Sequence, residues 1–406
     1  MERHKDMTVI VYRYNSICEP GYIDAFRALG LTVVECRQDR ELRDATLERK
    51  MTALAELIAV HRPLFVFSIN YFPFISMVCD RFHAIYTSVS VDCPVFEIYD
   101  VTIRNACNRV FLFDRAQYLS IRDENPAGIF HLSLGADVDR IEAAIGPFAE
   151  FENNETYDRD VAFVGSLYNE KDAWAGLTMA PDRRARMEEL LDEQQPIPGL
   201  DLLEKKLTDA DVTAFRGADP AFRPSERSVR DISRCFTVDH YLSDHLTSRD
   251  RVDLLNTLSS HLDAGQVHLF TQSETGELNG VVCHGGVNST TEMPLIFRRS
   301  RINLNPTMRA IRTGLPQRIW DVLGSGGFLL SNAQAEIPEQ LQIGRHLDVY
   351  EDPAELVEKV RYWLSHEDER KEVARAGYHE VREKHLILHR VAEMIGRMTD
   401  TGSKKE

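Results

Sequence analysis

The sequence predicts an α/β protein made of two consecutive domains, each organised around a parallel β-sheet. The first observation behind this prediction is that short apolar runs, rich in β-branched residues, alternate with segments of helical spacing. The second is the length of 406 residues, which is long for a single hydrophobic core. Because a helical crossover returns the chain to the same edge of a sheet, strands that alternate with helices are expected to pair in parallel.

The first part of the chain follows this alternation closely. Residues 8–12 (TVIVY) are predicted as a buried strand, and further strands are predicted at 31–35, 64–68, 85–91, 109–113 and 129–132. Helices are predicted at 22–29 and 47–61, ending at a glycine and before a proline respectively. A glycine, a proline and the polar run ENNETYDRD indicate a domain junction within residues 135–159.

The rest of the chain predicts a second domain of the same kind. Strands are expected at 160–164, 266–270 and 328–331 and just after residue 300, and helices at 292–299, 315–323, 353–365 and 367–385. The polar, mostly helical stretch 172–262 is predicted as an insertion. We therefore expect domains over 1–150 and 151–377 and a helical carboxyl end over 378–406, in a two-Rossmann architecture with a cleft between the domains.

The composition narrows the function classes. A net charge of −16 argues against a surface built to hold nucleic acid, and 43% hydrophobic with 28% charged residues is typical of a globular protein. The seven cysteines form no CxxC pair, which favours reduced thiols in the cytoplasm, and the first residues resemble no signal peptide. The most apolar window, 64–79, is too short and too polar to span a membrane. No histidine spacing supplies a full metal ligand set, so no metal is expected.

Two loops of the first domain carry candidate catalytic carboxylates, because ligands of such sheets bind at the carboxyl ends of strands. Asp92 lies in SVDCPVFE after a predicted strand, where it could act as a general base or be an ordinary turn residue before Pro94. Glu19 lies in YNSICEPG after the first strand, where it could be a second candidate base or part of a helix cap. The absence of GxGxxG from that loop disfavours a nicotinamide or flavin site.

Two loops of the second domain could contact a nucleotide. In VGSLYNEK, Gly165 lets a ligand approach the backbone and Lys171 offers a point charge for a phosphate. In CHGGVNSTTE, Gly285 and Gly286 permit close approach to a flat base, and Val287 could pack on its face. The end of that loop also resembles the amino-terminal cap of a helix.

The segment 301–339 combines a strand, a basic loop, a helix, a glycine-rich turn and a second strand. Arg312 and Arg318 lie beside the predicted helix start, where free N–H groups and a partial positive charge favour a diphosphate. Asp321 could accept hydrogen bonds from both hydroxyls of a ribose. Gly326 and Gly327 end the helix, either as a simple cap or as part of the diphosphate cradle.

Over most of its length the chain resembles the CgeB-like, spore-maturation-type glycosyltransferases of the family-one group, which have the GT-B fold. The similarity runs through YNSICEPGYIDAFRALG, INYFPFISMVCD, VDCPVFEIYD, RNACNRVFLFDRAQY, VAFVGSLYNEK, HGGVNSTTEMPLIFRRSRINLNPT and EKHLILHRVAEMI, and it is strongest in RTGLPQRIWDVLGSGGFLLSNAQAEIPE. The gaps in this similarity lie mainly within residues 172–260.

The resemblance implies a nucleotide-sugar donor held by the carboxyl-terminal domain and an acceptor held by the amino-terminal one. It places the nucleobase at His284–Gly285–Gly286–Val287, the ribose at Asp321 and the diphosphate near Gly165 and Lys171. It also implies that the last helix crosses back to the first domain. Many retaining members of the wider superfamily carry two glutamates eight positions apart, whereas this chain has Thr313 and Asp321, and it has Ser166 where those relatives often carry arginine.

These observations predict a cytoplasmic, metal-independent transferase. It moves a sugar from a nucleoside-diphosphate sugar, with UDP-sugars as the first candidates, to a hydroxyl of a protein or glycan acceptor. Asp92 is the first choice for base if the reaction inverts the anomeric centre, and Glu19 is the second. If the reaction retains it, the diphosphate itself could assist. Two alternatives stay open: a catalytically silent nucleotide-sugar-binding module, and a nucleotide-sugar epimerase.

Overall fold

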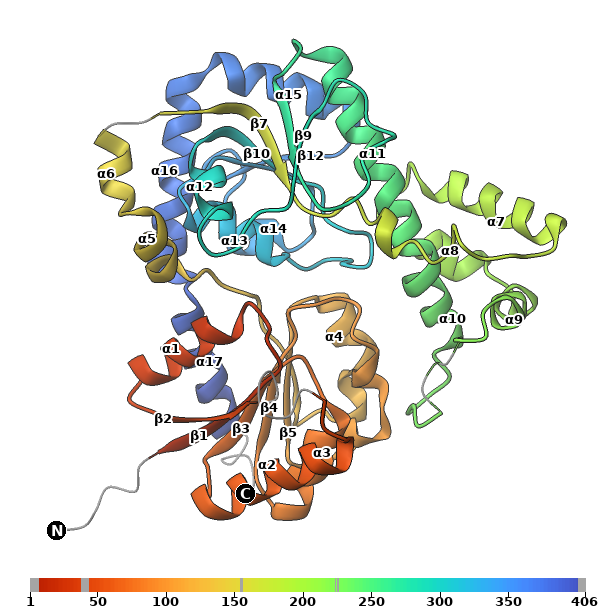
Figure 1. Cartoon of the computed structure of the whole chain (residues 1–406), viewed down its shortest axis with the longest axis vertical. Coiled ribbons are helices and arrows are strands. Elements are labelled where there is room, and N and C mark those ends of the chain that lie inside the picture. The colour runs from red at the N-terminus through yellow and green to blue at the C-terminus, as the bar shows by residue number, and fades with distance from the viewer. Residues whose placement is uncertain (1–6, 38–43, 154–155, 223, 225, 401–406) are drawn as a thin grey trace. The chain divides into compact units, whose positions relative to one another are not determined.

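The computed structural model describes residues 7–37, 44–153, 156–222, 224 and 226–400 (Figure 1). The chain divides into two compact units. Unit 1 comprises the described residues of Met1–Gly135, Ser225–Arg230 and His385–Glu406, and unit 2 comprises those of Ala136–Pro224 and Asp231–Lys384. The domain boundaries that the sequence predicts near residues 150 and 377 remain predictions.

Unit 1 is built on a parallel sheet of six strands, as far as the described residues show, in the order β2-β1-β3-β4-β5-β6. The strands are β1 (Thr8–Arg13), β2 (Thr32–Arg37), β3 (Phe65–Ile69), β4 (Tyr86–Val89), β5 (Asn108–Leu112) and β6 (Ile129–His131). β2 lies on one side of β1 and β3 on the other, so the strand order reverses between β1 and β3. Such a switch point, at the carboxyl ends of the strands, is where open α/β sheets bind ligands.

The helices of unit 1 are α1 (Glu19–Ala28), α2 (Leu47–His61), α3 (Pro73–Phe82), α4 (Arg115–Ile121) and α17 (Ile387–Asp400), with 3-10 turns η1 (Phe96–Tyr99), η2 (Val101–Arg104) and η3 (Arg122–Glu124). The last helix, α17, packs against α1 and places Val391 and Met394 in the core. These side chains recur at helical spacing, so burial of one apolar stripe explains why the carboxyl end of the chain joins the first unit.

Unit 2 has a second parallel sheet, again of six strands within the described ranges, in the order β12-β11-β10-β7-β8-β9. The strands are β7 (Arg159–Val164), β8 (Val267–Phe270), β9 (Val282–His284), β10 (Ser300–Asn305), β11 (Leu329–Asn332) and β12 (Asp348–Tyr350). After β9 the chain returns to the far side of β7 to form β10. The switch point of this sheet therefore lies between β7 and β10.

The main helices of unit 2 are α5 (Val138–Ile145), α6 (Phe148–Asn153), α11 (Ser243–His261), α12 (Met293–Arg298), α13 (Gln317–Gly324), α14 (Ile337–Gln340), α15 (Pro353–Ser365) and α16 (Glu367–Lys384). Side chains of α11 and α15 pack on the sheet, with Leu255, Leu258 and Val360 fully buried beside Val161 and Leu330. This apolar core fixes the loops at the strand ends.

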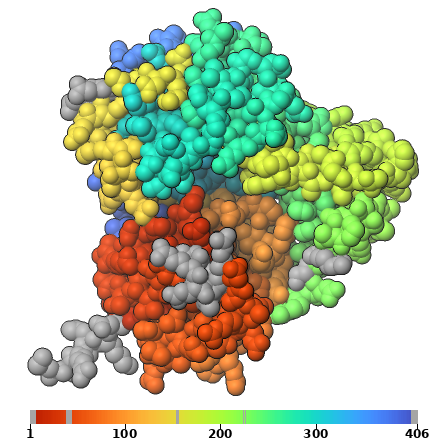
Figure 2. Space-filling model, viewed as in Figure 1, coloured from red at the N-terminus to blue at the C-terminus, as the bar shows by residue number. Residues whose placement is uncertain are grey.

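The stretch 172–262, predicted as an insertion, divides in two. Its last helix, α11, packs on the sheet, whereas the residues before α11, called the insertion from here on, form a helical layer with a core of its own. The elements of this layer are α7 (Pro181–Gln194), α8 (Asp201–Lys206), α9 (Asp209–Ala218), α10 (Ser233–Phe236) and the π-helical turn η5 (Thr237–Leu242), and η4 (Asn169–Lys171) precedes it. Trp174, Leu191, Leu203, Phe215 and Tyr241 are buried together there. The yellow-green helices α7 to α9 protrude from the rest of unit 2 (Figures 1 and 2).

The structure confirms the predicted α/β class and the parallel sheets. Pattern reasoning missed the short strands β9 and β12 and the helix α3. The helix that it predicted over 367–385 is α16, but it began the carboxyl-terminal helix at 378, inside α16. The two helices are separate, because α16 ends at Lys384, the N–H of Leu386 donates to His389 Nδ1 at 3.1 Å, and α17 begins at Ile387. No helix in the described part of the chain is long and apolar enough to cross a membrane.

Candidate functional site

The two strands at the switch point of unit 2 are bridged by the buried guanidinium of Arg251. This side chain comes from α11, and its Nη1 donates to the carbonyl oxygen of Ser166 at 2.6 Å while its Nη2 donates to that of Pro306 at 2.7 Å. Ser166 follows β7 and Pro306 follows β10. One arginine, only 8% exposed, thus spans the point at which the strand order reverses.

An aromatic ring holds two cations in the loop after β7. The guanidinium of Arg251 lies 4.8 Å from the centre of the Tyr168 ring, and Lys171 Nζ lies 4.8 Å from the same centre. The Phe163 ring supports Arg251 from 5.2 Å. Tyr168 has a φ of 68°, in the left-handed region that bulky residues seldom adopt. The predicted phosphate contact Lys171 therefore lies beside a second cation.

A third cation, Arg318, occupies the first turn of α13. Burial lowers the pKa of Arg318, and its nearest carboxylate, Asp321, is 3.9 Å away. Burial also lowers the pKa of Arg251, and the charge of Arg318 acts in the same direction. Among the described residues no carboxylate forms an ion pair with Arg251. A buried cation such as Arg251 with so little compensation favours an anion, and the half-buried Arg318 and the N–H groups at the amino terminus of α13 add to this preference.

Asp321 lies one turn into α13, where it was predicted to meet a ribose. Its Oδ1 accepts a hydrogen bond from Gln317 Nε2 at 3.0 Å, and burial raises the pKa of Asp321. The helix thus presents a cation and a carboxylate together near its amino terminus. That pairing is compatible with the predicted ribose contact, which stays a prediction.

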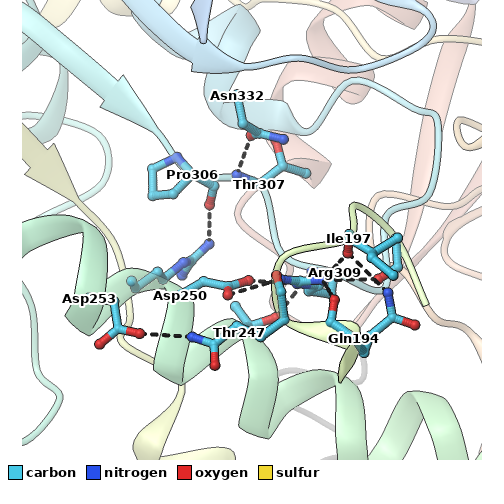
Figure 3. A network of polar contacts seen from close by, with 12 residues as sticks. Gln194, Ile197, Thr247, Asp250, Asp253, Pro306, Thr307, Arg309 and Asn332 are labelled. Carbon is cyan, nitrogen blue, oxygen red and sulfur yellow. Dashed lines mark hydrogen bonds and ion pairs between the residues drawn. The ribbon is translucent and has the colours of Figure 1, made fainter. Parts of the chain in front are cut away.

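The loop that leads from β10 to α13 is held from both sides (Figure 3). The N–H of Thr307 donates to Asn332 Oδ1 at 2.7 Å, which ties the loop to the end of β11. Arg309 forms a two-pronged ion pair with Asp250, at 2.6 and 2.9 Å. It also donates to carbonyl oxygens at the end of α7, those of Gln194, Gln195, Ile197 and Gly199. The insertion and the sheet together fix this loop.

Arg312, a predicted diphosphate contact, has carboxylate partners instead. Its Nη2 lies 2.8 Å from Asp239 and 2.9 Å from Glu204, both in the insertion. These two charges neutralise its own, so the geometry makes Arg312 an anchor between the loop and the insertion. Its role as a phosphate ligand has no support in these contacts and stays a prediction.

Packing accounts for the two glycines after α13. A Cβ on Gly326, which has a φ of 79°, would lie 2.2 Å from a ring carbon of Phe148. A Cβ on Gly327 would lie 2.6 Å from the carbonyl oxygen of Phe297. Both glycines precede β11 and so lie at the amino ends of the strands. The switch-point loops lie at the opposite, carboxyl ends. The diphosphate cradle predicted there is not needed to explain them.

The predicted nucleobase loop follows the edge strand β9. His284 ends the strand, and its ring stacks on Phe270 with centres 4.2 Å apart. Burial lowers the pKa of His284, with the charge of Arg159 adding to the effect. Gly285 has open space around it, whereas a Cβ on Gly286 would lie 2.4 Å from Gln272. Val287 is half-buried, and the loop presents no further polar contact that would identify a base.

Gly165 directly follows β7 and belongs to the loop that Arg251 touches. Its N–H donates to the carbonyl oxygen of Phe270 at 3.0 Å, and a Cβ there would lie 2.9 Å from the Phe163 ring. The glycine therefore lets the loop turn close to that ring. Gly165, Lys171 and Arg318 are the predicted residues that gather around Arg251.

In unit 1, Glu19 is a structural carboxylate. It is fully buried, its Oε1 accepts the N–H groups of Tyr14 and Ser16 at 2.8 and 3.2 Å, and its Oε2 pairs with Arg13 at 3.0 Å. Both oxygens are thus occupied by the loop after β1. A general base must reach a substrate proton, so these contacts do not fit the catalytic role. Glu19 holds the loop before α1 and does not cap the helix, because the N-cap is Cys18 and no side chain bonds there.

Asp92 is exposed in the loop after β4 and is thus able to meet a substrate. Its Oδ2 accepts a hydrogen bond from Asn70 Nδ2 at 2.6 Å. Asn70 directly follows β3, so the carboxylate is held by a residue at the switch point of unit 1. The two candidate bases therefore differ: Asp92 is available, and Glu19 is not.

A further acidic side chain lies beside the cation cluster. Burial raises the pKa of Asp244, in the first turn of α11, to about 6; Asp172 and Asp239 add to the rise, while Lys171 and Arg251 oppose it. An anionic ligand bound by Lys171 would meet this group. In the described ranges no group of three or more His, Cys, Asp or Glu side chains is arranged to hold a metal ion.

Sequence reasoning missed Arg251 and Asn70. Arg251 shares a helix face with Leu254, Leu255 and Leu258, and a charge within an apolar stripe was the available signal. Asn70 directly follows an apolar strand, as Asp92 does, but a lone amide in that position is also a common turn residue.

Known proteins resemble this chain in two ways: solved structures share its fold, and one sequence family matches part of its length. Residues 249–396 match the model of a family described as glycosyl transferase-like. No curated protein matches the chain.

Several solved structures share the fold at low identity. A glycosyltransferase from Rickettsia africae ESF-5 is 11% identical with a TM-score of 0.52, covering 98% of this chain and 100% of its own. Anabaena HepE in complex with UDP-glucose is 8% identical with a TM-score of 0.51, covering 97% and 100%. A UDP-forming α,α-trehalose-phosphate synthase from Burkholderia xenovorans is 12% identical with a TM-score of 0.51, covering 98% and 100%. The protein therefore has the GT-B fold, and its residues 249–396 are similar to the glycosyl transferase-like family.

Proposed function

We propose that the protein is a glycosyltransferase of the CgeB-like branch that moves a sugar from a nucleoside-diphosphate sugar to a hydroxyl group of a protein or glycan. UDP-sugars are the first candidates, because HepE is solved with UDP-glucose on the same fold. The observation that carries the proposal is the buried guanidinium of Arg251, with the half-buried Arg318 acting on its pKa, at the switch point of the second sheet.

The proposed diphosphate site consists of Arg251, Arg318, Lys171 and the N–H groups that begin α13. In an apolar setting these charges stabilise a diphosphate leaving group without the help of a metal ion. The matched family region, residues 249–396, contains both arginines and Asp321. Gly285, Gly286 and Val287 remain the proposed base contacts, and Asp321 the proposed ribose contact.

In the proposed reaction the acceptor oxygen forms a bond to the anomeric carbon while the bond from that carbon to the phosphate oxygen breaks. The bonding electrons leave with the diphosphate, and the hydroxyl proton moves to Asp92. A carboxylate base that activates the acceptor in this way leads to inversion at the anomeric centre. Residues 1–150 would supply the acceptor side and residues 151–377 the donor side, with the helix over 378–406 joining the first domain.

The proposed compartment is the cytoplasm. No disulfide is recorded for the seven cysteines, residues 18, 36, 79, 93, 107, 235 and 283. Reduced cysteines are typical of a reducing compartment, which supports this placement.

A thermal-shift screen with UDP-glucose, GDP-mannose and dTDP-glucose tests donor binding, because a ligand that binds only the folded protein raises its melting temperature. We expect at least one donor to raise it, and release of the nucleotide in the absence of acceptor. Tight binding without turnover over a broad acceptor panel would favour the silent binding module. Interconversion of the sugar without acceptor would favour the epimerase, and no shift with any donor would contradict the proposal.

A further inference from the structure

Asn70 has a backbone conformation that is uncommon outside glycine. Its φ is 54°, directly after β3, in the left-handed region. Asparagine tolerates this region better than most residues, yet such conformations gather at functional sites because the surrounding structure must hold them. The surroundings of Asn70 do hold it: its N–H donates to Val89 at 2.8 Å, and its carbonyl oxygen accepts from Ser68 Oγ at 2.7 Å.

Every polar atom of the Asn70 side chain has a partner. Oδ1 accepts the N–H of Val91 at 3.0 Å, which fixes which end of the amide is the donor. Nδ2 then donates one hydrogen to Asp92 Oδ2 at 2.6 Å and the other to the hydroxyl of Tyr14 at 3.2 Å. An amide bonded at all three positions cannot rotate, so it holds the Asp92 carboxylate in one orientation.

The same amide joins the three loops around the switch point of the first sheet. Tyr14 follows β1, Asn70 follows β3, and Asp92 follows β4. Burial raises the pKa of Tyr14 to about 12, and the charge of Asp92 acts in the same direction. Tyr14 is therefore a neutral hydroxyl at ordinary pH, and Asp92 is the exposed charged group of the three. The constellation presents one carboxylate to solvent at the place where such a sheet binds ligands.

We infer that Asn70 is a positioning residue that holds Asp92 in place to accept the proton of the acceptor hydroxyl. This inference rests on the proposed glycosyl transfer. The proton passes from the hydroxyl to Asp92 Oδ1 as the new glycosidic bond forms and the diphosphate departs with the bonding electrons. The hydrogen bond from Asn70 engages Oδ2 and leaves Oδ1 to accept the proton.

The test uses the full chain and two matched variants. Asn70→Gly keeps the left-handed backbone but removes the amide. Asn15→Gly makes the same exchange at an exposed asparagine with a φ of 80°, in the loop after β1, and serves as the control. Release of UDP from UDP-glucose in water gives kcat and KM, and the thermal shift with UDP-glucose reports donor binding.

Asn70→Gly is expected to lower kcat by up to about a hundredfold, because a base displaced by an ångström loses that much. In Asn70→Gly, KM and the donor-induced thermal shift should remain those of the wild type. In the control Asn15→Gly, kcat, KM and the thermal shift should all remain those of the wild type. In a double-mutant cycle, adding Asn70→Gly to the Asp92→Asn variant should lower kcat no further, because Asn70 acts through Asp92. Additive losses, or a wild-type kcat in Asn70→Gly, would overturn the inference.

A crystal structure of Asn70→Gly separates this inference from the proposed function. A displaced or rotated Asp92 side chain supports the positioning role whether or not any nucleotide-sugar binds. An Asp92 carboxylate unmoved from its wild-type place would overturn it, even if every donor test succeeded. Absence of any donor-induced shift in the wild type would instead count against glycosyl transfer.

Discussion

The guanidinium of Arg251 and the ring of Tyr168 face each other at 4.8 Å, and they come from segments on opposite sides of the helical insertion. Tyr168 belongs to the loop after β7, and Arg251 to the helix that follows the insertion. The ring holds Lys171 at the same distance, so one aromatic side chain sets the spacing of two cations. The proposed anion site therefore needs α11 to be packed against the segment that follows β7.

Replacing Arg251 with alanine is expected to abolish the thermal shift produced by UDP-glucose. The variant should also lose about 1–3 kcal/mol of unfolding free energy, because two carbonyl oxygens lose their donor. Arg249→Ala is the matched control: it removes the same charge from the same helix, but Arg249 pairs with the exposed Asp192 at 2.7 Å. Thermal shift and denaturant titration measure both effects. An unchanged donor shift in Arg251→Ala would rule out its role as a phosphate ligand.

Loss of Arg309 is expected to destabilise unit 2 strongly. Its side chain is 9% exposed and pairs with Asp250, so Arg309→Ala should cost about 3–5 kcal/mol of unfolding free energy. Lysine cannot reproduce the planar fork, and Arg309→Lys should recover only part of that loss. Arg301, whose 35% exposed side chain lies 3.3 Å from Asp160, is the control, and its alanine variant should cost about 0–1 kcal/mol. Equal losses at the two positions, measured by urea unfolding, would contradict the network in Figure 3.

A methyl group at Gly326 should destabilise the fold without affecting donor binding. The left-handed backbone alone costs an alanine about 1–2 kcal/mol, and the clash with Phe148 adds about 1–3 kcal/mol. Gly344→Ala isolates the first effect, because Gly344 has a φ of 77° and no neighbour within 4 Å of a Cβ. Calorimetry of the two variants, with and without UDP-glucose, compares them. If Gly326→Ala folded stably and lost only donor binding, the diphosphate interpretation of this glycine would regain support.

Asp244 should make stability depend on pH between about 4 and 6. Burial raises its pKa in the folded protein to about 6, whereas an unfolded aspartate titrates near about 3.9. The folded state thus favours the protonated form, and this stabilisation is lost as the pH rises through 6. Asp244→Asn is expected to be more stable than the wild type at pH 7.5, with a gap that narrows toward pH 4. Denaturant unfolding of both proteins between pH 4 and 7.5 measures this gap, and a gap that does not change with pH would contradict the prediction.

The fold could be predicted from the sequence because its signals are local. The run TVIVY and the later apolar runs are buried strands, and the helical spacing of residues 47–61 is that of α2. The short strands β9 and β12 could not be predicted in the same way. Three residues carry too little periodicity, and edge position leaves Val282 and Cys283 exposed.

The candidate site could be predicted only where charge and loop coincide in the sequence. Lys171 and Asp92 lie in segments that follow strands, and Arg318 lies in the first turn of the helix after such a loop, so local pattern could indicate all three. Arg251 lies on a helix 85 residues after Ser166, and the packing of α11 against the segment that follows β7 brings the two together. The neutralisation of Arg312 by Glu204 and Asp239 likewise depends on pairings that no local pattern contains.

The return of α17 to α1 has a consequence for how the chain matures. Ribosomal synthesis releases the amino-terminal strands first, yet the apolar stripe of the final helix is part of the same core. The first unit therefore stays partly uncovered until α17 has left the ribosome. A truncation that removes α17 would expose the core of the part of the chain that is made first.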